Sequence, residues 1–129
     1  ILDLLLDLQQ KKQMALILIT HDMAVVAETV ESVVVMYAGQ VVEKQSVDGI
    51  FSSPRHPYTA ALLDALPERS LGKPRLPTIS GIVPGRYDHI AGCIFNPRCQ
   101  YAAPKCKAKP PRLQAEGNGA VRCYFPLNK

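Results

Sequence analysis

Four cysteines are the residues with the clearest capacity for chemistry. They are Cys93, Cys99, Cys106 and Cys123, with five, six and sixteen residues between successive members. Such thiols can form two disulfides, hold zinc, hold an iron–sulfur cluster or stay free. Structural zinc sites usually contain pairs about two to four residues apart, which this chain lacks, whereas wider spacing suits a larger cluster. Spacing alone leaves these alternatives open.

The region around the cysteines is rich in proline and poor in apolar periodicity. A short region of this kind lacks the residues for its own core and usually needs a covalent or metal staple. Positive charge beside a thiol lowers its pKa. We therefore expect the neighbouring cations to favour thiolates and to offset the charge of a metal centre: Arg98, Lys105, Lys107 and Arg122.

A second candidate residue, His21, directly follows a continuous apolar run over residues 15–20. The run is rich in β-branched residues and predicts a strand covered on both faces in a parallel sheet. Ligand-contacting side chains collect just beyond the carboxyl ends of such strands. An imidazole there can donate to a phosphate oxygen or position an attacking water. The structural alternative is a histidine that only hydrogen-bonds the backbone at the end of the strand.

The elements that would position His21 are typical of an α/β domain. Helical spacing of apolar residues predicts a helix over residues 1–8 that fades within residues 9–13. Asp22 is a good N-cap for a helix over residues 23–30. Two β-rich runs, 33–37 and 40–43, flank Ala38-Gly39 and predict a hairpin. This order of elements indicates the last portion of an α/β domain.

Composition changes abruptly near residues 52–57. Residues 1–53 carry seven acids against three lysines, a net charge of −4, whereas residues 54–129 carry +8, all eleven prolines and all four cysteines. The change predicts a boundary between regular structure and a loop-rich region. No apolar run reaches the ~18 residues of a membrane span, and no signal peptide is evident. Because the chain opens inside a helical pattern, we interpret it as a piece of a longer polypeptide.

Two motifs in the first part resemble the end of the nucleotide-binding subunit of an ABC transporter. They are Leu-Ile-Leu-Ile-Thr-His-Asp-Met at residues 16–23 and Val-Val-Val-Met-Tyr-Ala-Gly-Gln-Val-Val-Glu at residues 33–43. In the second part, His-Pro-Tyr-Thr at residues 56–59 resembles the signature of oligopeptide, dipeptide and nickel importer ATPases. Short segments at residues 77–81, 84–85 and 92–99 are also similar to the C-terminal extension of these importers.

The resemblance implies an α/β fold class, the C-terminal remnant of a P-loop ABC ATPase domain (residues 1–53) followed by a loop-rich, cysteine-containing extension (residues 54–129). It gives His21 the role of the switch histidine that contacts the γ-phosphate of ATP. The chain has no Gly-rich phosphate loop, no Asp–Glu strand end and no signature motif, which lie upstream in the family. We therefore expect a longer parent protein to bind ATP and Mg²⁺, and the chain alone not to hydrolyse ATP.

The resemblance also implies a cofactor and partners. The extension of peptide-importer ATPases is associated with a four-cysteine [4Fe–4S] site, here Cys93, Cys99, Cys106 and Cys123, with zinc or no metal as alternatives. The parent would power peptide or nickel import at the cytoplasmic face of a bacterial or archaeal membrane. Its partners would be a second ATPase subunit (a paralogue), permease subunits and, indirectly, a solute-binding protein. The isolated chain, with its two-faced strand unpaired, is expected to self-associate.

The His-Pro-Tyr-Thr segment predicts a helix, because Pro57 suits the first helical position. Tyr58, Ala61, Leu62 and Ala65 would share one face, and Pro67 would end the helix. This face either packs on the chain's own domain or recognises another subunit.

An alternative hypothesis of a different class is that the chain is a stand-alone metal-binding or nucleic-acid-binding domain. The +8 charge of residues 54–129 suits an anionic partner such as nucleic acid or lipid headgroups. Its cations are scattered among prolines without a stripe at helical spacing, so we expect no nucleic acid.

Overall fold

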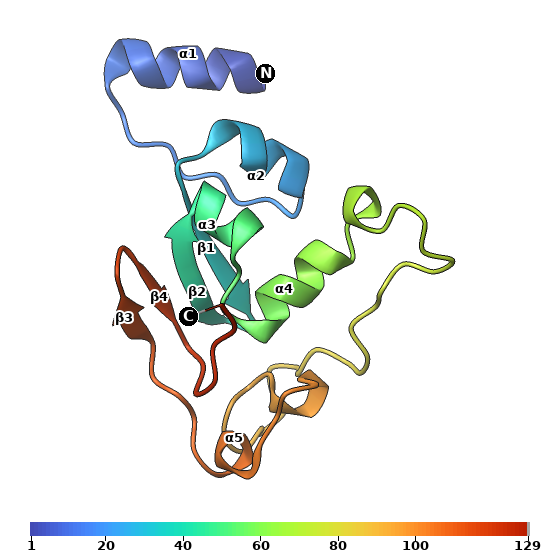
Figure 1. The fold of residues 1–129 in the computed structure, drawn as a ribbon. Helices are drawn as coiled ribbons and strands as arrows, with labels where there is room; N and C mark the ends of the chain where they lie inside the picture. Colours follow the sequence, from blue (N-terminus) through green and yellow to red (C-terminus); the bar gives the residue numbers. More distant parts are fainter. Residues whose placement is uncertain (129) are drawn as a thin grey trace.

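The computed structural model of the chain describes residues 1–128. Short helices and strands alternate with long connections (Figure 1), in this order: α1 (Leu2–Lys12), α2 (Met23–Thr29), β1 (Ser32–Tyr37), β2 (Gln40–Ser46), α3 (Val47–Ser52), α4 (Pro57–Asp64), η1 (Pro67–Arg69), η2 (Asn96–Arg98), α5 (Pro104–Ala108), β3 (Gln114–Glu116) and β4 (Gly119–Val121). None of the helices within these residues has the length and apolarity that a membrane crossing requires.

The sheet is antiparallel throughout, with the strand order β1-β2-β4-β3. The predicted hairpin is confirmed: β1 and β2 are joined by Ala38 (φ 46°) and Gly39 (φ 81°), and the two positive φ angles suit a tight hairpin turn. β2 continues to Ser46 and pairs on its other side with β4, where Glu43 lies opposite Val121. The sheet thus brings the end of the chain beside the first hairpin.

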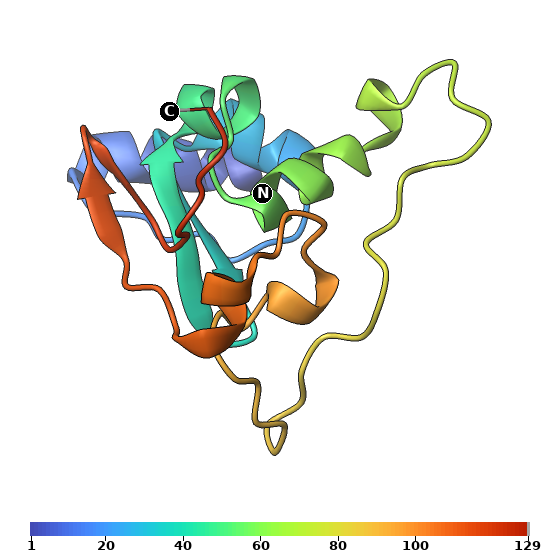
Figure 2. The same cartoon turned by 60° about the horizontal axis from the view of Figure 1, so that its bottom comes forward.

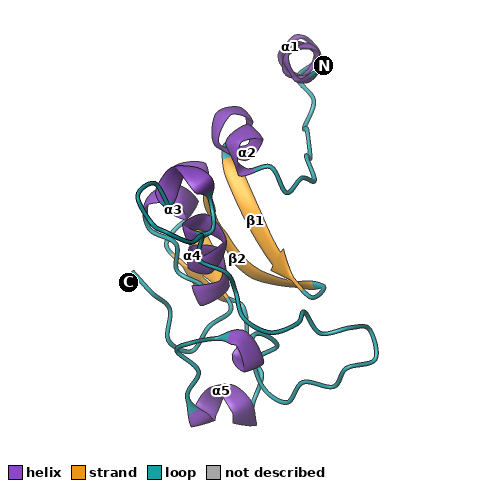
Figure 3. Ribbon diagram, turned by 90° about the vertical axis from the view of Figure 1, so that its right-hand side faces the viewer, coloured by secondary structure: helices purple, strands orange, loops and turns teal. Residues whose placement is uncertain are grey.

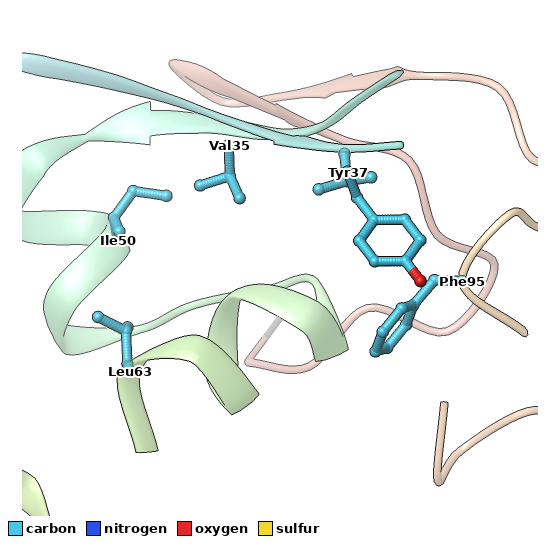
Figure 4. Packing of buried hydrophobic residues seen from close by; sticks show 6 residues of the cluster. Val35, Tyr37, Ile50, Leu63 and Phe95 are labelled. Carbon is cyan, nitrogen blue, oxygen red and sulfur yellow. The ribbon is translucent and has the colours of Figure 1, made fainter. Parts of the chain in front are cut away.

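The core lies between this hairpin and helices α3 and α4, which lie together beside β1 and β2 in Figure 3. Ile50 of α3 and Leu63 of α4 are completely buried against Val35. Phe95 joins them from the cysteine region, and its ring centroid lies 5.1 Å from that of Tyr37 (Figure 4). The core therefore includes residues from both sides of the composition change.

The prediction of a buried strand over residues 15–20 is wrong for this structure. The segment has no regular secondary structure, and Ile17 and Ile19 are 87% and 95% exposed. A strand forms only when its backbone groups pair with a neighbour, and none of the strands within residues 1–128 lies beside it. The predicted helix before it is confirmed as α1, which has no buried residue and stands away from the sheet (Figures 1 and 3).

The predicted starts of two helices are confirmed. Asp22 Oδ1 accepts the backbone N–H groups of Ala24 and Val25 at 3.0 and 3.2 Å and caps α2. Pro57 is the first residue of α4, whose cap is the His56 side chain. The helix packs on the chain's own hairpin.

The predicted face and end of α4 need correction. Its most buried residues are Pro57, Thr59 and Leu63, while Tyr58 and Leu62 are only half-buried. Residues 60–63 are all apolar. Helical periodicity therefore could not predict which face of the helix packs against the core. The helix ends at Asp64 rather than at Pro67, which begins η1. Beyond η1, residues 71–92 form a long loop on the outside of the chain (Figure 2).

Candidate functional site

The four cysteines come together around one cavity of about 20 Å³, room for about one water molecule. Cys93 and Cys99 flank η2, Cys106 lies in α5, and Cys123 follows β4. In Figure 1 these segments lie at the lower end of the ribbon, around α5. All four thiols are free in this structure, and Cys106 is the buried member. The sequence-predicted cysteine residues are therefore neighbours in space.

A close approach of two backbone segments joins Cys93 to Cys106. The N–H of Cys93 donates to the carbonyl oxygen of Cys106 at 2.7 Å. The preceding residue, Gly92, has a φ of +76°, and a Cβ at this position would overlap that same carbonyl and lie 2.7 Å from the carbonyl carbon of Lys107. Only glycine fits this conformation and this space. Gly92 is therefore part of the site, although sequence analysis gave it no role.

The thiols lie in surroundings that favour their neutral form. Burial raises the pKa of Cys93 and Cys99, and raises the pKa of Cys123 to about 11; in each case Cys106 raises the pKa further. The expectation that four nearby cations would lower these pKa values is wrong for these three thiols. Arg122 lowers the pKa of Cys93, but this effect is smaller than that of burial.

Two of the expected cations are engaged elsewhere. Arg98 donates to the backbone carbonyls of Ile79 and Ser80. The Lys105 ammonium lies 4.6 Å from the centre of the Tyr124 ring. Arg98 is therefore bound to backbone of the long loop, and Lys105 lies against a ring that lines the cavity.

The four thiols share one cavity but do not form a metal-binding geometry in this structure. The four cysteines line one cavity whose remaining walls are largely aromatic or proline. Within residues 1–128, no group of three or more Cys, His, Asp or Glu side chains is close enough to hold a single metal ion. The cavity as it stands has room for a water-sized group and no more.

His56 lines the same cavity and was missed as a site residue, although its motif was identified. The residue is 1% exposed, and burial lowers its pKa to about 4. Glu43, also completely buried, accepts the backbone N–H groups of Arg55 and His56, both at 2.8 Å. The two motifs that contain Glu43 and His56 are therefore in direct contact. No sequence signal links them, because the contact forms between separate elements.

His21 lies apart from this cluster in a different environment. It is exposed, and within residues 1–128 its side chain makes no hydrogen bond or ion pair. Its neighbours are structured: Thr20 Oγ1 accepts the N–H of Asp22 at 3.0 Å, and Asp22 caps α2. His21 thus lies two residues before the first residue of α2, with an exposed side chain.

Comparison with known proteins gives this arrangement a family context. Residues 42–106 match a family model described as the C-terminal region of oligopeptide/dipeptide transporters. The chain is similar to the dipeptide transport ATP-binding protein DppD of Haemophilus influenzae, with 53% identity over 129 residues, 100% of the chain and 39% of that relative. The DppD protein of Escherichia coli is 54% identical over 129 residues, 99% of the chain and 39% of the relative.

A more distant relative has a similar name. The probable peptide ABC transporter ATP-binding protein y4tR of Sinorhizobium fredii is 44% identical over 126 residues, 96% of the chain and 38% of that relative. The chain thus spans less than half the length of the curated relatives it matches, and it matches their C-terminal part. It belongs to the oligopeptide/dipeptide transporter family, as the C-terminal region of such a protein.

Proposed function

We propose that the chain is the C-terminal part of the ATP-binding subunit that powers peptide, or nickel, import by an ABC transporter. The observation that supports this most directly is 53–54% identity along the whole chain to dipeptide transport ATP-binding proteins. Residues 1–53 would complete the nucleotide-binding domain, and residues 54–129 would form the family-specific extension. The phosphate loop and the Mg²⁺-binding carboxylate would belong to a longer parent protein.

In this proposal His21 contacts the γ-phosphate. Its exposure beside the capped start of α2 supports the role, because an imidazole without a protein partner is free to donate to phosphate. Bound ATP supplies the bond that is broken, and His21 orients the γ-phosphate and the attacking water.

The test is to compare the parent protein, with the phosphate loop present, with a His21→Ala variant. We expect Mg²⁺-dependent phosphate release to fall by about 10²-fold or more with ATP binding retained. The 129-residue chain itself should release no phosphate. Turnover by the isolated chain, or full activity of the variant, would overturn the assignment of these roles.

We further propose that the four cysteines hold a [4Fe–4S] cluster with a structural or regulatory role. Their convergence on one cavity supports a shared ligand, and their spacing suits a cluster better than zinc. Cys93, Cys99, Cys106 and Cys123 would each supply one thiolate, and Arg122 would offset part of the resulting negative charge. Iron ions bound there would supply positive charge to the four thiolates, of which only that of Cys106 belongs to a buried residue.

Anaerobic purification tests this cofactor. We expect a brown protein with a broad visible absorption band, stoichiometric iron and sulfide, and loss of both in each Cys→Ser variant. Colourless protein with one zinc per chain would contradict the cluster and support a zinc site instead. Metal-free anaerobic protein would reject both, whereas air-exposed protein is no test because oxygen destroys such clusters.

The proposed partners follow from the same assignment. A second, paralogous ATPase subunit would form a closed dimer with this subunit around bound ATP. Permease subunits would bind this dimer at the cytoplasmic face of the membrane and change conformation with it. A solute-binding protein would take part only through the permease. Co-purification of tagged parent protein with a paralogous ATPase and two permease subunits is expected, and a stable homodimer without them would contradict the proposal.

A further inference from the structure

Strand β2 carries one residue more than β1 in the first hairpin. Val35 lies opposite Glu43, and the next residue, Met36, lies opposite Val41, so Val42 is an extra residue of β2. Val42 and Glu43 are both buried, at 1% and 0% exposed, although the side chains of successive strand residues normally point to opposite faces. This pattern is a β-bulge, which locally redirects the side chains and backbone groups of the strand that carries it.

The bulge places two neighbouring carbonyl groups within reach of one arginine. The N–H of Arg122 donates to the carbonyl oxygen of Val42 at 2.8 Å, and Nε of the same residue donates to the carbonyl oxygen of Val41, also at 2.8 Å. In a regular strand these two carbonyls would point to opposite edges. Strand β4 ends at Val121, opposite Glu43, so Arg122 is the first residue beyond the paired strands. Its two bonds therefore fix the course of the chain directly after β4.

The next residue is Cys123, and the residues on its two sides bind successive prolines. Nη1 of Arg122 donates to the carbonyl oxygen of Pro111 at 3.3 Å, and the hydroxyl of Tyr124 donates to the carbonyl oxygen of Pro110, also at 3.3 Å. Because proline has a fixed φ and no N–H, the pair offers its carbonyls from a stiff backbone. The backbone of Cys123 is thus held on both sides against one segment.

The proline pair connects Cys123 to the other cysteines. It closely follows α5, which contains Cys106. Cys106 is joined in turn to Cys93 by the 2.7 Å backbone hydrogen bond, and all four cysteines line one cavity. The sulfur of Cys123 accepts a local hydrogen bond, from the N–H of Phe125 at 3.4 Å. The place of this thiol at the cavity therefore depends on how the backbone beside it is held.

We propose that Arg122 is a positioning residue, which holds Cys123 at the shared cavity by binding the bulge of β2 and the carbonyl of Pro111 at the same time. The role depends on the shape of the guanidinium, because a planar fork can donate to carbonyls that lie in different directions. It makes the β-bulge, in the first part of the chain, a part of the cysteine site. The inference rests on the proposed function in one respect, that the four cysteines form one site, and it requires no bound metal.

Two variants of the full chain separate the shape of the Arg122 side chain from its charge. Arg122→Lys keeps the positive charge and the backbone N–H but cannot reproduce the two side-chain bonds. Arg122→Gln removes the charge as well. Two further variants test the alternatives. Tyr124→Phe removes only the hydroxyl bond to Pro110, and Arg112→Lys, at an exposed arginine that follows the proline pair, is the matched control.

The readout is the rate at which iodoacetamide modifies each cysteine of reduced, metal-free protein, measured by peptide mass spectrometry. In both Arg122 variants we expect the rate at Cys123 to rise about tenfold, the ratio that corresponds to one lost hydrogen bond, with the other three rates unchanged. Tyr124→Phe should raise the rate at Cys123 by about threefold at most, because the bonds of Arg122 remain. Arg112→Lys should change none of the four rates. Iron bound after anaerobic reconstitution with Fe²⁺ and sulfide is measured on the same proteins.

The proposal would be overturned by an unchanged rate at Cys123 in Arg122→Lys, since a rise in Arg122→Gln alone would assign the effect to charge. An equal rise at all four cysteines, or a comparable rise in Tyr124→Phe or Arg112→Lys, would also overturn it. If the Arg122 variants do not fold, Tyr124→Phe decides, because a protected Cys123 there leaves Arg122 as the residue that holds it and an exposed one contradicts this. A selective rise at Cys123 in a chain that never binds iron would reject the cluster and leave the role of Arg122 standing.

Discussion

Arg98 Nη1 donates a hydrogen bond of 3.2 Å to the hydroxyl oxygen of Tyr37, although 61 residues separate them. The same guanidinium lies 5.8 Å from the centre of the Tyr37 ring and donates to the carbonyls of Ile79 and Ser80. Arg98 thus connects the long loop, the cysteine region and the end of β1. Its planar guanidinium donates to three acceptors in different directions, and a lysine ammonium cannot reproduce this set of hydrogen bonds.

Substituting Arg98 should therefore release the long loop. For Arg98→Lys we expect a loss of about 1–3 kcal/mol in the free energy of unfolding, measured in urea, and faster proteolysis within residues 71–92. Arg86→Lys, at an exposed position of the same loop, should change neither. Equal proteolysis of both variants would contradict the role given to Arg98.

Gly92 should be intolerant of any side chain. A Cβ there overlaps the carbonyl that accepts the Cys93 N–H, so Gly92→Ala must push the two cysteine segments apart. We expect a loss of about 3 kcal/mol or more in the free energy of unfolding, and weaker iron binding. Gly72→Ala is the matched control, because Gly72 has a similar φ of +84° with nothing within 4 Å, and should cost about 1 kcal/mol. A similar loss of stability in both variants would show that the positive φ, and not the overlap with the carbonyl, accounts for the effect.

Local sequence patterns predicted the elements whose signals are local. The Asp22 cap, Pro57 at the start of α4 and the Ala38-Gly39 turn were all found from neighbouring residues. The prediction of a strand over residues 15–20 failed because a strand needs a neighbouring strand to pair with. The contact of Glu43 with His56 was not predictable, since it depends on how β2, β4 and α4 pack.

Thr59 should be replaceable by valine with a gain in stability. Its hydroxyl is buried and, within the described part of the chain, has no hydrogen-bond partner. Valine has the same shape without the cost of burying that hydroxyl, so Thr59→Val should raise the free energy of unfolding by about 1 kcal/mol. Thr29→Val is the matched control in another helix, because Thr29 Oγ1 donates to the carbonyl of Val25 at 2.6 Å. A gain in both variants, or in neither, would contradict this explanation.

The isolated chain should self-associate through its exposed extended segment. Ile17 and Ile19 are almost fully exposed, and Val34 and Met36 on β1 are about half exposed. Unpaired extended backbone with apolar side chains invites pairing between copies. Light scattering should show dimers or larger species that an Ile17→Asn/Ile19→Asn double variant reduces to monomer. Leu71→Asn, at another exposed apolar residue, should have no effect. A parent chain that stays monomeric at high concentration would contradict the prediction.

The buried His56 ring should make stability depend on pH in a defined window. Burial lowers the pKa of His56 from 6.5 to about 4, while Glu43 and the Arg122 backbone oppose this shift. Between these two pH values the unfolded chain binds a proton that the folded chain does not, so the free energy of unfolding falls as the pH falls from 6.5 to about 4. The loss across this window should be about 3 kcal/mol at most.

Urea titrations at several pH values between these limits measure this dependence. His56→Gln should remove most of the slope, because glutamine has no proton to take up, whereas His89→Asn, at an exposed histidine, should leave it unchanged. A slope that persists in His56→Gln would contradict the assignment of this pH dependence to His56. A flat profile in the unmodified chain would mean that the folded state accepts a charged His56 ring, against the burial that the structure gives it.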